Sequence, residues 1–216
     1  SIADVNYPLP QLVDSNVIAV GTGDDHTCAL YESQIVKCWG GNYDSQLGTG
    51  NSYWYNQPTS INLSSNIPII SLEVAYKNTC AISEQLVPYC WGANWWGQTG
   101  NGGGDNTHQS NPLPIGVNTA LIDFGEMPNV IATSINGNTL CIIHAGQNNS
   151  SHSLGDVVCG GQAYRGQMGD GNWNNSWSDV NLSHVNLSSD YIGPSSYNGA
   201  GGIHISERDI DSDSII

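Results

Sequence analysis

The sequence predicts an all-β chain made of tandem repeats, and two observations lead to that prediction. The first is a pattern that occurs twice: residues 26–30 (HTCAL) and 38–42 (CWGGN) recur 52 positions later as residues 78–82 (NTCAI) and 90–94 (CWGAN). The second is that no stretch of the chain shows sustained helical periodicity. A repeat of this length fits the four-stranded blade of a β-propeller.

A third copy of the pattern is longer than the first two. It contains residues 138–143 (NTLCII) and 159–162 (CGGQ), and a polar insert, residues 147–152, separates its two cysteines. A fourth copy is partial, because no second cysteine strand follows Gly202–Ser206. We therefore expect a repeat domain over residues 1–206, with repeats at about 8–56, 57–110, 111–177 and a partial repeat at 178–206, followed by an acidic tail at 207–216. Three complete repeats and a part predict an open or incomplete ring.

Each copy is expected to contain extended segments in the same order. A Pro-containing segment comes first, an apolar run second and the two cysteine strands last, and a Gly-rich stretch such as Gly40–Asn51 leads to the next copy. The Pro-containing segments are expected at Tyr7–Val13, Gln57–Leu63 and Asn111–Val117, and the corresponding segment of the fourth copy, which lacks proline, is expected at Ser178–Leu182. The apolar runs are expected at Val17–Val20, Ile67–Val74, Val130–Ile135 and Tyr191–Gly193.

The six cysteines fall into one pair in each complete copy. Antiparallel pairing of the two cysteine strands would set the members of a pair opposite each other, which predicts three local disulfides. The predicted pairs are Cys28 with Cys38, Cys80 with Cys90 and Cys141 with Cys159. Zinc binding is the alternative, but none of the pairs has the C-x-x-C spacing that wraps a metal, so the spacing favours disulfides.

The charge of the chain limits its partners. Four Lys and Arg residues stand against nineteen Asp and Glu residues, which gives a formal net charge of -15. Phosphate binding needs clustered basic side chains, so nucleic acid is not an expected partner.

No apolar run reaches the length of a transmembrane helix, so membrane insertion is not expected either. The first residues lack the basic and apolar regions of a signal peptide, and we expect the chain to begin after processing.

Two features indicate an extracellular location. Paired cysteines are typical of oxidising compartments. N-x-S triplets, which accept N-linked glycans, occur six times, although an Asn- and Ser-rich chain produces some of them by chance. The candidate glycosylation sites are Asn62, Asn148, Asn149, Asn174, Asn181 and Asn186, with Asn148 or Asn149 preferred because the polar insert is expected to be a loop.

Catalytic signatures are absent from the sequence. There is no G-x-S-x-G, no H-E-x-x-H and no Gly-rich phosphate loop. His26 occupies a repeat position that holds Asn78 in the second copy, which favours a turn hydrogen bond over proton transfer. Residues 209–213 alternate carboxylates as a calcium loop does, but they lack the following Gly and the distant Glu, so a solvated tail is favoured. We expect no enzyme, no cofactor and no metal site.

Clusters of aromatic residues are the remaining functional signal. They lie beside or within the Gly- and Asn-rich stretches that follow the cysteine strands, where rings could stack on sugars, enter a partner's pocket or cover the rim of a blade. These residues are Tyr53, Trp54, Tyr55, Trp95, Trp96, Trp173 and Trp177. Trp39 and Trp91 differ, because they end a cysteine strand and are expected to pack between blades.

The succession HTCAL, CWGGN and SQLGTG in residues 26–50 resembles the repeat of the regulator of chromosome condensation family, whose members are seven-bladed β-propellers. The resemblance covers about residues 8–206 and weakens in the third copy, where Gly160 replaces the Trp. It implies propeller blades and, through secreted relatives that include a bacterial inhibitor of β-lactamases, a role in binding. The nuclear members are exchange factors for a small GTPase on chromatin, a role that the acidic charge disfavours.

The function that these observations favour is a non-catalytic, secreted glycoprotein that serves as an extracellular filament or coat subunit. An incomplete last repeat would leave a strand such as Gly202–Ser206 to pair with a neighbour, which makes self-association the expected mode of assembly. Two alternatives stay open. One is a secreted module that binds a carbohydrate or another extracellular protein, and the other is a fragment of a longer, closed propeller.

Overall fold

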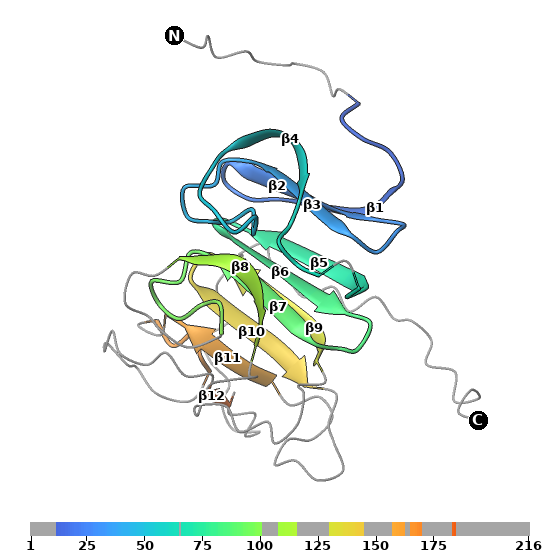
Figure 1. Ribbon diagram of the computed structural model, residues 1–216. Coiled ribbons are helices and arrows are strands. Elements are labelled where there is room, and N and C mark those ends of the chain that lie inside the picture. The colour runs from blue at the N-terminus through green and yellow to red at the C-terminus, as the bar shows by residue number, and fades with distance from the viewer. Residues whose placement is uncertain are drawn as a thin grey trace, which may run out of the picture. The chain divides into compact units, whose positions relative to one another are not determined.

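The computed structural model of the chain describes residues 12–64, 66–100, 108–115, 130–144, 157–162, 165–169 and 183–184. These residues belong to the first of two compact units, Ser1–Asn186, and the second unit, Leu187–Ile216, lies outside them. They form strands and connections that build three four-stranded antiparallel sheets (Figure 1). The predicted all-β fold is confirmed.

The strands of each sheet follow one another in the sequence. Sheet 1 contains β1 (Val17–Thr22), β2 (His26–Tyr31), β3 (Val36–Gly40) and β4 (Tyr55–Ser60). Sheet 2 contains β5 (Ile69–Ala75), β6 (Asn78–Ser83), β7 (Pro88–Gly92) and β8 (Gln109–Pro114). Sheet 3 contains β9 (Val130–Asn136), β10 (Thr139–His144), β11 (Val157–Gly161) and β12 (Ser183–His184).

The register of the two central strands places the cysteines of each sheet opposite each other. Disulfides join them, with Cα atoms 4.1 or 4.2 Å apart. The bonded pairs are Cys28 with Cys38, Cys80 with Cys90 and Cys141 with Cys159, which are the pairs that the repeat predicts.

The glycine that ends the third strand of each sheet has a geometric role. Gly40, Gly92 and Gly161 have φ angles of 103°, 108° and 112°, in the region that favours glycine. A Cβ atom at any of them would collide with the backbone carbonyl of the residue just before the second strand. The glycine of the repeat therefore lets the chain leave the sheet close to its neighbouring strand.

The sequence repeats and the sheets are offset by one strand. The Pro-containing segment does not open a sheet: β4 and β8 pair with the preceding cysteine strand and form the outer edge of sheets 1 and 2. Pro58 and Pro112 lie in these edge strands, where a missing backbone donor is tolerated. In sheet 3, Ser183–His184 pair with β11, and the predicted segment Ser178–Leu182 lies outside the described residues. The rest of the predicted fourth repeat and the predicted tail lie outside the described residues.

Adjacent sheets pack face to face through two apolar cores. Strands β1 and β2 contact β5, and strands β5 and β6 contact β9. The first core joins sheets 1 and 2 around Leu30 and Trp91, and the second joins sheets 2 and 3 around Ile82 and Leu140. Strand β6 is buried along its whole length, because sheet 2 has a neighbour on each face.

A backbone contact repeats at both junctions. Gln34 and Leu86 lie in the hairpin turns of sheets 1 and 2 with φ angles of 62° and 60°. The carbonyl of Gln34 accepts a hydrogen bond from the amide of Ile69, and the carbonyl of Leu86 accepts one from the amide of Val130. The first residue of each following sheet is thus bonded to the hairpin of the sheet before it.

Candidate binding surfaces

The turn that follows each third strand is built by side-chain amides. Asn42 Oδ1 accepts a hydrogen bond from the amide of Leu47 at 2.9 Å, and Gln46 Oε1 accepts one from the amide of Asp44 at 2.9 Å. In the second copy, Gln98 Oε1 accepts from the amide of Trp96 at 2.8 Å in the same way. The Asn and Gln of the repeat therefore maintain the turn through their side-chain oxygens.

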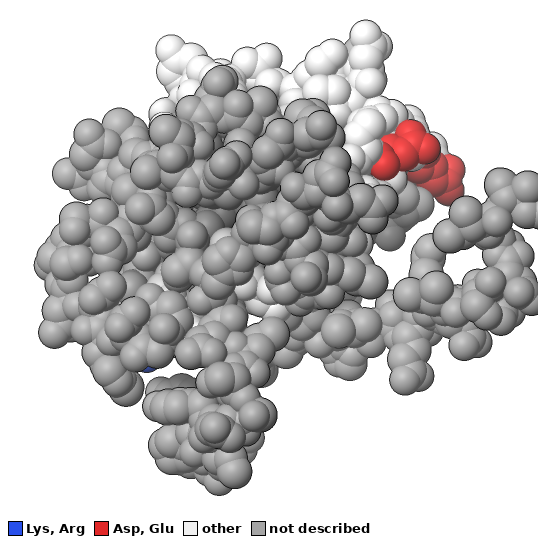
Figure 2. All heavy atoms as spheres, turned by 90° about the horizontal axis from the view of Figure 1, so that it is seen from below, with Lys and Arg blue, Asp and Glu red and all other residues white. Residues whose placement is uncertain are grey.

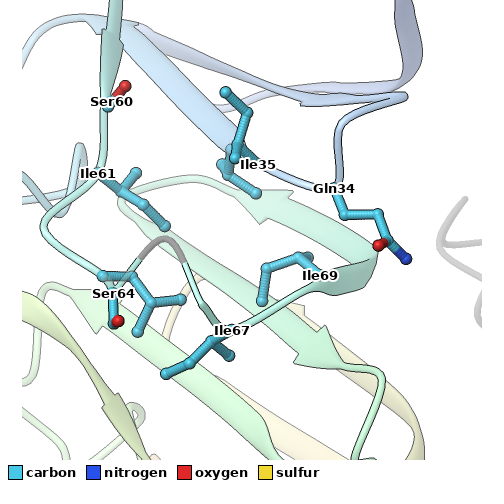
Figure 3. A pocket seen from close by; sticks show the side chains of 9 residues that line it. Gln34, Ile35, Ser60, Ile61, Ser64, Ile67 and Ile69 are labelled. Atoms are coloured by element: carbon cyan, nitrogen blue, oxygen red, sulfur yellow. The ribbon is translucent and has the colours of Figure 1, made fainter.

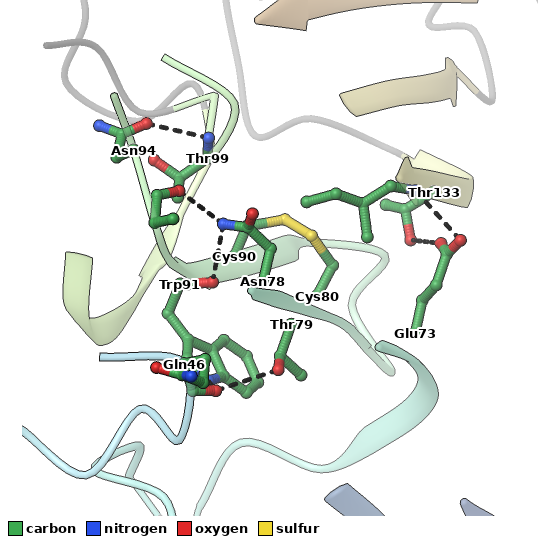
Figure 4. Close-up of a disulfide and its surroundings, with 12 residues drawn as sticks. Gln46, Glu73, Asn78, Thr79, Cys80, Cys90, Trp91, Asn94, Thr99 and Thr133 are labelled. Atoms are coloured by element: carbon green, nitrogen blue, oxygen red, sulfur yellow. Dashed lines mark hydrogen bonds between the residues drawn. A yellow bond between two sulfur atoms is a disulfide. The ribbon is translucent and has the colours of Figure 1, made fainter. Parts of the chain in front are cut away.

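This turn also bonds sheet 1 to sheet 2. The carbonyl oxygen of Gln46 accepts two hydrogen bonds from sheet 2, one from Trp91 Nε1 at 2.9 Å and one from Thr79 Oγ1 at 3.1 Å (Figure 4). The Trp91 ring is fully buried against Gly48, where a Cβ atom would lie 2.6 Å from the indole nitrogen. Trp91 thus packs between two blades, as the sequence predicts.

His26 is part of the same network. Thr79 Oγ1 uses its hydrogen for Gln46, so it accepts from His26 Nε2 at 3.1 Å, which assigns the proton to Nε2. Burial lowers the pKa of His26 to about 4, so the ring is neutral at pH 7. The hydrogen bond reaches across the two sheets, where the sequence predicts a bond within a turn. His26 therefore has a structural role.

Glu73 joins sheets 2 and 3. Its two carboxylate oxygens accept hydrogen bonds from the amide of Ile135 at 3.0 Å and from Thr133 Oγ1 at 3.3 Å (Figure 4). Burial raises the pKa of the Glu73 carboxyl above its usual value. The sequence gives no signal for this contact, because the corresponding position in sheet 1 is Gly21, which leaves space for Val74 instead.

A polar and aromatic cluster lies at the junction of sheets 1 and 2. Lys77 Nζ forms an ion pair with the buried Asp44 at 2.9 Å and lies 5.2 Å from the centre of the Trp95 ring. The bond to Asp44 raises the pKa of Lys77. The Trp95 ring contacts the His108 ring edge-on, with 5.4 Å between their centres. The sequence names Trp95 as a candidate binding residue, and the structure leaves it only partly exposed. The sequence does not predict this cluster, because Lys77 replaces the Asp25 of the first copy.

The other predicted aromatic residues lie in different surroundings. Tyr53 and Trp54 are exposed, at 74% and 69%, and form an aromatic surface beside β4. Tyr55 is the first residue of β4 and is only partly exposed, and its hydroxyl accepts a hydrogen bond from Asn51. Trp96 is partly buried, and Trp173 and Trp177 lie outside the described residues.

Trp39 differs from its counterpart Trp91. It is only partly buried, because it faces away from sheet 2 on the first sheet of the described region. Nearby on the same sheet, Lys37 forms an ion pair with Asp14 at 3.4 Å, and the Tyr31 hydroxyl donates to Asp14 Oδ2 at 2.6 Å. The prediction that both tryptophans pack between blades therefore fits Trp91, while Trp39 has no blade against it among the described residues.

An apolar cavity opens at the other end of the junction between sheets 1 and 2. It has a volume of about 170 Å³ and is lined mainly by aliphatic side chains, among them Ile35, Ile61, Ile67 and Ile69 (Figure 3). Sites for small organic ligands usually have volumes of about 300 to 1,000 Å³. The cavity is large enough for one apolar side chain.

Of the six candidate glycosylation sites, the described residues include one. Asn62 is exposed, and its side-chain nitrogen, to which a glycan would be attached, donates a hydrogen bond to Asn111 Oδ1 at 2.6 Å. The other five, Asn148, Asn149, Asn174, Asn181 and Asn186, lie outside the described residues.

The described surface contains acidic groups but no cluster that could hold a metal ion. On the face seen in Figure 2, the visible acidic side chains of the described region gather in one patch. Within this region no three His, Cys, Asp or Glu side chains lie close enough together to hold a metal ion. No helix of membrane-spanning length and hydrophobicity occurs in the part of the chain that the structure describes.

Comparison with known proteins supports the repeat. The family model of the regulator of chromosome condensation (RCC1) repeat matches residues 17–46. The chain is 33% identical over 101 residues to the ultraviolet-B receptor UVR8 of Arabidopsis thaliana, covering 46% of this chain and 22% of the receptor. It is 28% identical over 88 residues to alsin of Rattus norvegicus, covering 38% of this chain and 5% of alsin. The matched regions are thus small parts of these relatives.

Solved structures show the same fold. A structure of Kap60 bound to yeast RCC1 (Prp20) matches with a TM-score of 0.64 and 13% identity over 81% of this chain and 38% of the other. Prp20p of Saccharomyces cerevisiae, described with its binding to Gsp1p and histones, matches with a TM-score of 0.58 and 15% identity over 83% and 41% of the two chains. The family match shows a regulator of chromosome condensation repeat at residues 17–46. The likeness to the solved structures shows that the described sheets have the fold of β-propeller blades.

Proposed function

We propose that the chain is a secreted, glycosylated and non-catalytic propeller protein that acts outside the cell as a structural or assembly subunit. The observation that carries the proposal is the disulfide in the centre of every sheet. Local crosslinks of this kind form and persist in oxidising compartments and stabilise each blade on its own.

The polar groups of the described region support a role without catalysis. His26 is neutral and bonded across two sheets, and both oxygens of Glu73 accept hydrogen bonds from β9. Asp44 pairs with Lys77. These groups hold neighbouring blades together. We therefore expect the protein to act by binding other molecules through its exposed surface.

A binding module for a carbohydrate or another extracellular protein is the second candidate. The exposed Tyr53 and Trp54 favour it, because adjacent aromatic rings offer flat apolar surface to a sugar or to a partner's side chain. Solved relatives of this fold are described with protein partners, namely Kap60, Gsp1p and histones, which also fits a binding role. A longer, closed propeller is a third candidate, since the chain spans 38% of the yeast RCC1 chain.

Native material separates these candidates. The proposal expects no alkylation of cysteine before reduction, a mass loss on glycosidase treatment and self-association in light scattering. Thiols that alkylate without reduction, or an unchanged mass, would contradict secretion as a glycoprotein. A monodisperse monomer would favour the binding module, and a deglycosylated mass well above the 23.0 kDa of this chain would favour the longer propeller.

A further inference from the structure

Sheets 2 and 3 each have one face that is covered by the preceding sheet. The corresponding face of sheet 1, which points away from sheet 2, is called its outer face. Ile69 and Val130, the first residues of sheets 2 and 3, are 1% and 0% exposed, because the preceding sheet covers them. Their counterpart in sheet 1, Val17, is 37% exposed. Val20, two residues before the end of β1, is 65% exposed.

This face also carries the donors that bond one blade to the next. In sheet 2, Thr79 and Trp91 are cross-strand neighbours, and both donate to the carbonyl of Gln46. In sheet 1, Thr27 and Trp39 are cross-strand neighbours in the same register. They present an equivalent hydroxyl and indole N–H.

The complementary turn recurs at the other end of the row of sheets. The amide of Arg165 donates to Gln167 Oε1 at 2.7 Å, as the amide of Asp44 does to Gln46 Oε1. The amide of Gly169 donates to the carbonyl of Gly166 at 3.1 Å, matching the bond from Gly48 to Ser45 in the first copy. The chain therefore contains both halves of the contact that joins sheets 1 and 2.

We propose that the outer face of sheet 1, formed by Val20, Thr27 and Trp39, binds the turn Arg165–Gly169 of a second copy of this chain. The inference rests on the proposed assembly and names its contact. Trp39 and Thr27 of one copy would donate to the carbonyl of Gln167 of the next. Lys37, which stands where sheet 2 has the buried Tyr89, would enter the contact already paired with Asp14.

A contact of this kind joins two different surfaces, so it leaves one free face at each end of a dimer. Further copies can add in the same way, and the assembly grows as a fibre unless its rotation closes a ring. A second copy is the favoured occupant because the complementary turn is present in this chain.

Sedimentation velocity of the full 216-residue chain over a range of concentrations tests the proposal. Val20→Lys places a charge on the face and should abolish self-association, whereas Ile70→Lys, at a 46% exposed position of β5, should leave it unchanged. Trp39→Phe keeps a ring but removes the donor, so it should raise the dissociation constant of self-association roughly tenfold. Indole N–H signals in NMR should include one that shifts with concentration and disappears in Trp39→Phe.

The outcomes distinguish this contact from assembly in general. If the chain associates but Val20→Lys and Trp39→Phe leave its dissociation constant unchanged, the contact is wrong and assembly uses another surface. If the unmutated chain stays monomeric at every concentration, both the contact and the assembly are wrong. Circular dichroism of each variant verifies folding, and a Val20→Lys variant that does not fold leaves Trp39→Phe and its NMR signal to decide.

Discussion

The indole nitrogen of Trp91 donates a hydrogen bond to the carbonyl oxygen of Gln46, 2.9 Å away, across the junction of two sheets. A residue 45 positions earlier in the chain thus accepts the bond that fixes how one blade sits on the next. Gly48 has no side chain, so the Trp91 ring can lie against it and reach the carbonyl of Gln46.

The first prediction compares the two tryptophans of the repeat. Trp91→Phe removes a buried donor and shrinks a fully buried ring, so it should lower the free energy of unfolding by at least about 1 kcal/mol. Trp39→Phe should change it much less in dilute solution, because Trp39 has no blade against it among the described residues. Urea unfolding at pH 7 measures both values. Equal losses would show that the inter-sheet hydrogen bond does not stabilise the fold.

The second prediction concerns the disulfides. Replacing Cys80 and Cys90 together by alanine should lower the free energy of unfolding by about 2 to 3 kcal/mol, since the crosslink restricts the unfolded chain. The same change at Cys141 and Cys159, which close a longer loop, should cost about 0.5 kcal/mol more. Denaturant unfolding of both double variants gives the comparison, and peptide mapping of the unreduced chain should show three bridges within repeats and none between them.

The third prediction is a pH dependence due to His26. Its pKa in the folded chain is about 4, below the 6.5 of the unfolded chain, so the unfolded state binds more protons between these values. The contribution of neutral His26 to the free energy of unfolding is therefore fully present above pH 6.5. It decreases as the pH drops toward 4, by up to about 3 kcal/mol.

The control for His26 is His26→Gln, which retains a side-chain N–H donor but does not titrate. Subtracting its stability curve from that of the unmutated chain removes the titration of the many carboxylates. The difference should decrease steadily from pH 6.5 to 4, and a flat difference would mean that His26 titrates alike in the folded and unfolded chains.

The fourth prediction concerns Glu73. Glu73→Gln keeps an oxygen for the amide of Ile135 and removes a charge that burial disfavours, so stability at pH 7 should be unchanged or higher. Glu73→Ala leaves that amide without its acceptor and should cost about 1 to 3 kcal/mol. Thermal and urea unfolding of the two variants provide the measurement. A loss in Glu73→Gln as large as in Glu73→Ala would show that the negative charge itself matters.

The sequence predicts those parts of the structure that every copy repeats. The cysteine pairs and the all-β fold follow from residues that recur in all three complete copies. The position of Trp91 follows from the first two copies only, and the same reasoning does not hold for Trp39 among the described residues. Contacts made by residues that differ between copies escape this reasoning. Glu73 stands where sheet 1 has Gly21, and Lys77 stands where the first copy has Asp25, so neither contact could be inferred from a repeat.

The order of strands within a copy shows a second limit. The Pro-containing segments were expected to open each copy, and the two that the structure describes, in β4 and β8, lie instead at the outer edge of the preceding sheet. A repeating sequence fixes the spacing of strands but not the point at which one sheet ends, because any starting point gives the same period. Only the hydrogen-bond partners of β4 and β8 decide it.

Because of the one-strand offset, the segment that a gene duplication copies and the segment that folds as one sheet have different ends. A gene duplication that adds one whole period adds one complete sheet wherever its ends fall, because each outer strand comes from the stretch that follows. Such a chain can gain or lose blades by recombination without first acquiring a boundary between them. A chain cut just before Tyr55, in contrast, would expose the unpaired edge of β3, and unpaired strand edges promote aggregation.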